Sequence, residues 1–159
     1  MIELTVPDAE AMEALGARLA PLLRAGDLVL LDGELGAGKT TLTRGLGAAL
    51  GARGAITSPT FVLSRVHPTA AGTPLVHVDA YRLSALELDD LDLDLDGSIT
   101  VVEWGEGKLA EAESWLRVAI ERPRGGDLDA EEEPRRVTIA GVGARGAELE
   151  AALADSLYA

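Results

Sequence analysis

A glycine-rich stretch between two apolar segments carries the clearest chemical signal in this sequence. Residues 33–40 read Gly-Glu-Leu-Gly-Ala-Gly-Lys-Thr and match the pattern G-x-x-x-x-G-K-S/T. In such a loop, successive backbone N–H groups line one concavity that binds polyphosphate, and the following helix adds partial positive charge there. Lys39 would reach the β and γ phosphates of a nucleotide, and the Thr40 hydroxyl would bind Mg²⁺. The motif therefore predicts a nucleotide site.

The segments on either side of this motif are those that a phosphate-binding loop requires. Residues 28–31 form an apolar run that is short enough for a buried strand. Leu42, Leu46 and Leu50 recur every four residues and mark one stripe of a helix, which Gly51 could end. A strand, a glycine turn and a helix in this order favour a working phosphate loop over a chance glycine-rich turn.

Two further apolar runs end in a carboxylate. Asp79 closes the run that begins at Leu75, and Glu103 closes the run that begins at Ile99. Ligands of open α/β sheets collect at the carboxyl ends of the strands, and nucleotide hydrolysis needs a carboxylate that holds Mg²⁺ or positions water. We therefore expect at least one of Asp79 and Glu103 to be functional, although either could instead be a helix cap or a surface acid.

Three other features have both a functional and a structural interpretation. Residues 57–60, Thr-Ser-Pro-Thr, could face the γ-phosphate as a switch-like loop, or they could simply form a turn around the proline. Trp104 could line the site or stack on a base, or it could be an ordinary core residue. His77 lies within an apolar run and is more simply interpreted as a core histidine.

Hydrophobic patterning predicts the remaining elements. The acidic segment 86–96 is more simply a solvated face than a metal site. We expect a helix after Asp8 that Pro21 kinks or ends, a helix from Ser84 to about Leu91, and a last helix around Leu149. We expect strands over residues 1–7, 60–66, 75–79, 99–103, 115–121 and 135–140, the last two as an antiparallel pair.

Composition limits the class of protein. The 159 residues, 47% of them hydrophobic, are enough for one domain with its own core, spanning residues 1–159. The absence of cysteine excludes disulfides and thiol catalysis, and no apolar run approaches a membrane span or a signal peptide, so we expect a cytoplasmic protein. A net charge of −13 argues against unaided binding to nucleic acid.

The missing residue types also bear on the nucleotide. The chain contains neither Asn nor Gln. It therefore lacks the Asn-Lys-x-Asp motif that reads guanine and the Gln that orients water in small GTPases. ATP is the better prediction.

At this point the sequence resembles a known family, the TsaE (YjeE) family of bacterial ATPases. The resemblance rests on the loop 33–41 together with Ser-Pro-Thr-Phe at 58–61, His-Val-Asp-Ala-Tyr-Arg at 77–82 and Val-Glu-Trp at 102–104, in one order and at suitable spacing. It runs from about Thr5 to Ala140. The fold that it implies is α/β: a single P-loop NTPase domain with a mostly parallel central sheet, flanking antiparallel strands, and helices on both faces.

The resemblance also implies a role for individual residues. Lys39, Asp79 and Glu103 would be catalytic, and Thr40, Asp79 and Glu103 would hold Mg²⁺. The nucleotide would be bound by Trp104 and the loop residues Gly33, Glu34, Leu35, Gly36, Ala37, Gly38, Lys39, Thr40 and Thr41. The acidic loop 127–133 lies where the family would place a contact to adenine, so no adenine-binding residue follows from it.

By the same resemblance, the protein would be an ATPase subunit required for threonylcarbamoyladenosine modification of tRNA. It would work with the TsaD and TsaB proteins, which carry out the transfer, and its ATP hydrolysis would reset the complex between turnovers. It would meet tRNA only through these partners. The sequence leaves open two other functions, a small-molecule kinase and a regulatory module that binds nucleotide without significant hydrolysis.

Overall fold

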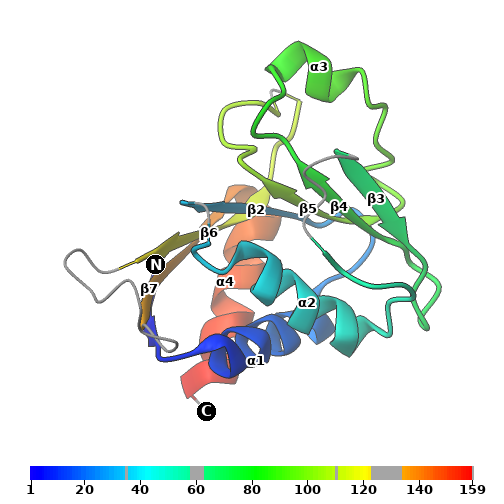
Figure 1. Cartoon of the computed structure of the whole chain (residues 1–159). Coiled ribbons are helices and arrows are strands. Elements are labelled where there is room, and N and C mark those ends of the chain that lie inside the picture. The colour runs from blue at the N-terminus through cyan, green and yellow to red at the C-terminus, as the bar shows by residue number, and fades with distance from the viewer. Residues whose placement is uncertain (35, 58–62, 110, 123–133, 159) are drawn as a thin grey trace.

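A single mixed sheet forms the centre of the protein. The computed structural model describes the chain except residues 35, 58–62, 110, 123–133 and 159. Among the described residues, seven strands follow the spatial order β1-β7-β6-β2-β5-β4-β3 (Figure 1). Their bounds are β1 Ile2–Val6, β2 Leu28–Gly33, β3 Ser64–His67, β4 Leu75–Asp79, β5 Ile99–Glu103, β6 Trp115–Glu121 and β7 Arg135–Val142.

The pairing of these strands confirms the predicted sheet. The central strands β6, β2, β5 and β4 run parallel to one another. On one side β7 pairs antiparallel with β6 and β1 pairs antiparallel with β7, and at the other edge β3 pairs antiparallel with β4. The carboxyl ends of the four parallel strands therefore lie at one edge of the sheet, where an α/β fold places its ligands.

Helices cover the two faces unequally. Helices α1 (Ala9–Leu19), α2 (Lys39–Leu50) and α4 (Gly143–Tyr158) lie on one face, where they bury the larger apolar cluster, and the short α3 (Ala85–Asp89) lies on the other (Figure 1). Asp8 caps α1 by accepting a hydrogen bond from the Ala11 N–H at 2.8 Å.

Two expected boundaries of α1 and α2 are confirmed. The 3₁₀ turn η1 (Ala20–Leu22) follows α1 directly, with Pro21 near its start, because a proline cannot continue the α-helical hydrogen bonds. Gly51 ends α2 in the left-handed conformation, with φ of 70°.

The opposite face differs in detail from the sequence prediction. Ser84 and Glu87 form a capping box, as expected for a helix that starts there, but α3 ends at Asp89 rather than near Leu91. Beyond it the backbone turns, and alternate leucines pack against the smaller apolar cluster while the aspartates between them are exposed. The acidic segment is thus a solvated face, and the described residues include no group of three or more His, Cys, Asp or Glu side chains that could together hold a metal ion.

The described part of the edge strand β3 differs in its ends from the predicted strand over residues 60–66. It runs from Ser64 to His67, and Leu63 just before it has a positive φ of 70°, which is incompatible with a regular strand. Residues 58–62, which include most of the predicted switch-like loop, lie outside the described part of the chain. No described helix is both long and apolar enough to cross a bilayer.

Candidate functional site

The site is built where β2, β4 and β5 end. Asp79 pairs in register with Glu103, and Glu103 pairs with Leu31 of β2, two residues before the phosphate loop. The strands β4 and β5 are buried along their whole length, because apolar layers cover both faces of the parallel sheet. Asp79 and Glu103 end these two strands, so they are the positions at which a charged side chain can reach a ligand at the edge of the sheet.

These strand ends and the loop enclose one cavity of about 390 Å³. It brings together most of the residues that the sequence singled out, together with two that it did not assign. Its walls are formed by Gly36, Gly38, Lys39, Thr40, Thr41, Asp79, Tyr81, Arg82, Glu103 and Trp104.

The loop has the backbone of a phosphate-binding turn. Gly36 and Gly38 have φ of 76° and 123°, values that side-chain-bearing residues rarely adopt, and α2 starts directly after them. The Ala37 N–H donates to the Glu34 carbonyl at 3.0 Å, which closes the turn. The N-terminus of α2 forms part of the cavity wall through Gly38, Lys39 and Thr40. An anion in the cavity would therefore be attracted by the partial positive charge of the helix N-terminus.

The Lys39 ammonium lies at the centre of the site. Its Nζ donates to the carbonyls of Gly33 at 2.5 Å and Glu34 at 3.0 Å, and it lies 4.5 Å from the centroid of the Trp104 ring. Burial lowers the pKa of Lys39, while the neighbouring carboxylates, chiefly Glu103 and Asp79, act in the opposite direction. The cation is thus held ready beside the loop by groups that a phosphate can replace.

The two carboxylates are each anchored through one oxygen. Oε2 of Glu103 lies 2.6 Å from Nε2 of His77, and Oδ1 of Asp79 accepts a hydrogen bond from the Tyr81 N–H at 3.0 Å. The second oxygen of each has no partner among the described residues. Nucleotide-bound Mg²⁺ takes one or two carboxylates plus phosphate oxygens and water. Thr40, Asp79 and Glu103 all line this cavity, and their side-chain oxygens are ligands of the kind in that set.

Trp104 is a cavity residue rather than an ordinary core residue. It has a positive φ of 64°, so the chain turns sharply where β5 ends, and its N–H donates to the Leu31 carbonyl at 3.1 Å. Its ring also contacts Tyr81, with centroids 5.0 Å apart and planes inclined by 57°. The rings of Trp104 and Tyr81 therefore lie together in the cavity that the predicted phosphate loop lines.

The other predicted loop residues have different places. Gly33 and Glu34 contribute carbonyls to Lys39 and do not line the cavity, and Ala37, within the loop, is buried. Leu35 lies outside the described residues.

Sequence reasoning missed three side chains. Tyr81 and Arg82 line the cavity, and their closeness to Asp79 in the chain was the available signal. Arg135 of β7 donates to the Ala37 carbonyl at 3.0 Å and the Gly36 carbonyl at 3.4 Å. Because C=O and N–H of a trans peptide point in opposite directions, the bond to Ala37 directs the Gly38 N–H away from Arg135. No local pattern could indicate this contact, which joins residues 98 positions apart.

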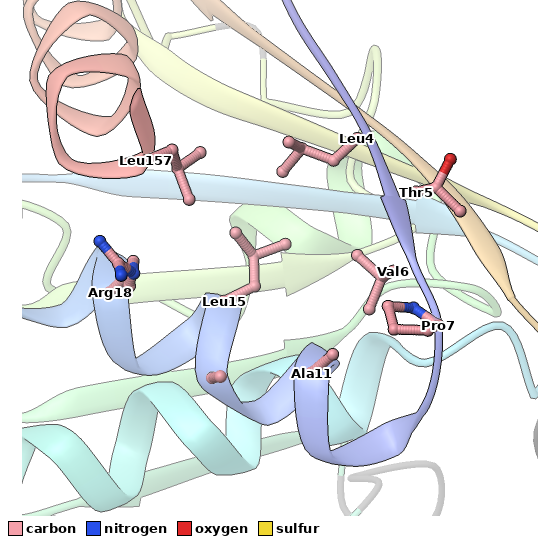
Figure 2. A pocket seen from close by; sticks show the side chains of 9 residues that line it. Leu4, Thr5, Val6, Pro7, Ala11, Leu15, Arg18 and Leu157 are labelled. Carbon is pink, nitrogen blue, oxygen red and sulfur yellow. The ribbon is translucent and has the colours of Figure 1, made fainter. Parts of the chain in front are cut away.

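A second cavity, of about 220 Å³, lies between β1, α1 and the end of α4 (Figure 2). Apolar side chains such as Leu4, Leu15 and Leu157 form most of its wall. Arg18 is its charged residue, and the Arg18 guanidinium already donates to the Ser156 carbonyl. This cavity holds none of the predicted site residues.

Comparisons with known proteins show the family of this chain. The family described as threonylcarbamoyl adenosine biosynthesis protein TsaE matches residues 6–128. A Streptomyces coelicolor protein named tRNA threonylcarbamoyladenosine biosynthesis protein TsaE is 61% identical over 87% of this chain and 96% of its own length. A Bacillus subtilis protein of the same name is 34% identical over 86% of this chain and 83% of its own.

A solved structure has the same architecture. The crystal structure of Bacillus subtilis YdiB superposes with a TM-score of 0.77 at 28% sequence identity, and covers 97% of this chain and 94% of its own. The phosphate loop, the paired strand-end carboxylates and the TsaE profile all fall within the same part of the chain. This chain therefore belongs to the TsaE family, whose members are named for the biosynthesis of threonylcarbamoyladenosine in tRNA.

Proposed function

We propose that the protein is a Mg²⁺-dependent ATPase subunit that serves threonylcarbamoyladenosine modification of tRNA. In this proposal it works with the TsaD and TsaB proteins in the cytoplasm, and its ATP hydrolysis resets their complex between turnovers. The observation that carries the proposal is the single cavity in which a phosphate loop faces Asp79 and Glu103.

The residues of the cavity divide the work of hydrolysis. The loop amides and Lys39 would bind the β and γ phosphates, and Lys39 would also stabilise the negative charge that develops on the γ-phosphate in the transition state. Thr40, Asp79 and Glu103 would hold Mg²⁺, which when bound polarises the phosphate oxygens. Asp79 or Glu103 would orient the attacking water. Arg82, also on the cavity wall, is a cation that the chain itself supplies near the site.

The charge of the chain supports a division of labour with partners. With a net charge of −13 the subunit repels a phosphate backbone, so tRNA would be held by the partner proteins. The names of its relatives refer to this modification, and an acidic subunit with a predicted nucleotide site fits an accessory role in it.

The decisive experiment measures phosphate release from ATP, with and without Mg²⁺, for the protein alone and with purified TsaB and TsaD proteins. We expect Mg²⁺-dependent release that the partners stimulate. In Glu103→Ala this release should fall about 100-fold, which is ~2.7 kcal/mol of transition-state stabilisation, because one Mg²⁺ ligand is lost. Nucleotide binding in EDTA should persist, since the loop is unchanged.

Two results would contradict the proposal. Tight ATP binding without hydrolysis under any partner condition would leave a regulatory nucleotide-binding module. Equal hydrolysis by the wild type and Glu103→Ala would remove the carboxylate from the mechanism.

A further inference from the structure

The imidazole of His77 makes its hydrogen bond to a carboxylate of the candidate site. His77 Nε2 lies 2.6 Å from Glu103 Oε2, and both side chains are buried, at 0% and 5% exposure. The interpretation of His77 as a plain core residue accounts for its burial. It does not account for a short contact to a group that lines the nucleotide cavity.

The register of β4 and β5 explains how this pair forms. Asp79 lies directly opposite Glu103, and His77 lies two residues before Asp79, so all three side chains emerge on the same face of the sheet. Glu103 therefore has a carboxylate beside it and an imidazole diagonally behind it. Two like charges directly opposite each other repel, and a hydrogen-bond donor at His77, two residues before Asp79 on the same strand, counters that repulsion at Glu103.

We propose that His77 is a positioning residue for Glu103, an inference that rests on the proposed function. An ionised carboxylate only accepts hydrogen bonds, so Nε2–H donates to Oε2. This contact holds one oxygen of Glu103 back in the sheet and leaves Oε1 for Mg²⁺ at the cavity. The other ring nitrogen, Nδ1, has no partner among the described residues, so the ring is committed to Glu103 alone.

Loss of the His77 contact should affect Mg²⁺ binding but not Mg²⁺-free nucleotide binding, whereas a general loss of structure would affect both. His77 does not line the cavity and has no hydrogen bond to the phosphate loop in the described part of the chain. Its removal should leave Mg²⁺-free nucleotide binding intact, whereas the Mg²⁺-dependent gain in affinity should fall. Groups that orient metal ligands from behind affect metal affinity or activity about 10- to 100-fold.

The test uses a fluorescent, non-hydrolysable ATP analogue, titrated in EDTA and at increasing Mg²⁺, with the full-length protein. His77→Leu should bind the analogue in EDTA within about twofold of the wild type, and should need about tenfold more Mg²⁺ for the same gain. His77→Gln places an amide N–H near the Nε2 position and should restore most of the Mg²⁺ response. His77→Asn, an amide too short to reach Glu103, should not.

His67 provides the matched control. It is also buried, and its Nδ1 lies 3.0 Å from the Arg53 carbonyl, while its Nε2 likewise has no partner among the described residues. It is therefore a similar imidazole without a link to the site. His67→Leu should leave the Mg²⁺ response unchanged, whatever its effect on thermal unfolding.

Each remaining outcome overturns the inference. A wild-type Mg²⁺ response in His77→Leu, or equal loss in the Gln and Asn variants, would show that the contact to Glu103 does not position a ligand. Parallel loss of EDTA affinity and thermal stability in all His77 variants would make His77 structural. If the nucleotide affinity of the wild-type protein does not depend on Mg²⁺, the proposed function is refuted, and the inference with it.

Discussion

The two cavities described above differ in what surrounds them. The first, of about 390 Å³, lies at the carboxyl ends of parallel strands, and its Lys39, Asp79 and Glu103 are each held by a neighbouring polar group. The second, of about 220 Å³, lies beside the antiparallel edge strand β1 and has mostly apolar walls (Figure 2).

The difference lies in the backbone rather than in the size of the cavity. Parallel strands bring several strand ends and a helix start to one place, so charged side chains from distant positions meet there. Around β1, the side chains of a strand and two helices pack sideways against each other and leave a gap between apolar groups. A polar cavity with anchored charges indicates chemistry, whereas the apolar gap reflects packing.

The largest expected effect is the loss of Lys39. Lys39→Ala removes the cation that would bind the β and γ phosphates, and ATP affinity should fall by about 100-fold or more, because charge-assisted hydrogen bonds to phosphate are strong. Isothermal titration calorimetry would measure it. Arg18→Ala removes a cation from the apolar cavity and serves as the control, with unchanged affinity. Equal affinities in all three proteins would abolish the distinction between the cavities.

The next largest effect concerns stability in the apolar cavity. Leu15 is buried there, at 7% exposure, and Leu15→Ala should lower the free energy of unfolding by about 2–3 kcal/mol through lost burial and a larger void. ATP affinity should stay the same at a temperature where the variant is folded. Urea unfolding followed by circular dichroism, combined with calorimetry, would check both parts. A variant of normal stability but weak ATP binding would give the apolar cavity a functional role that we do not expect.

The smallest of these effects tests the support behind the loop. Arg135→Ala removes the donor to the Ala37 carbonyl, so the Gly38 N–H is less firmly directed, and ATP affinity should fall by about tenfold. Arg136→Ala is the neighbouring control, since that side chain instead pairs with Glu3 at 3.6 Å on the sheet edge. If the two variants bind ATP equally well, the contact from β7 does not shape the site.

Much of the fold was predictable because its signals are local. The apolar runs of β2, β4 and β5, the four-residue leucine spacing of α2 and the glycine at its end depend only on nearby residues, and the structure confirms them. The ends of α3 and β3 were not predictable, because the first depends on where leucines pack after the helix and the second on an unusual backbone conformation at Leu63.

For the site, the sequence by itself predicted the phosphate loop and the two strand-end acids, since spacing along the chain reflects backbone geometry that phosphate binding requires. It did not indicate Tyr81, Arg82 or Arg135. Only the tertiary structure decided how the site residues are held. The bond from His77 to Glu103 spans 26 positions and that from Arg135 to Ala37 spans 98, and contacts between distant segments leave no periodic trace in a sequence.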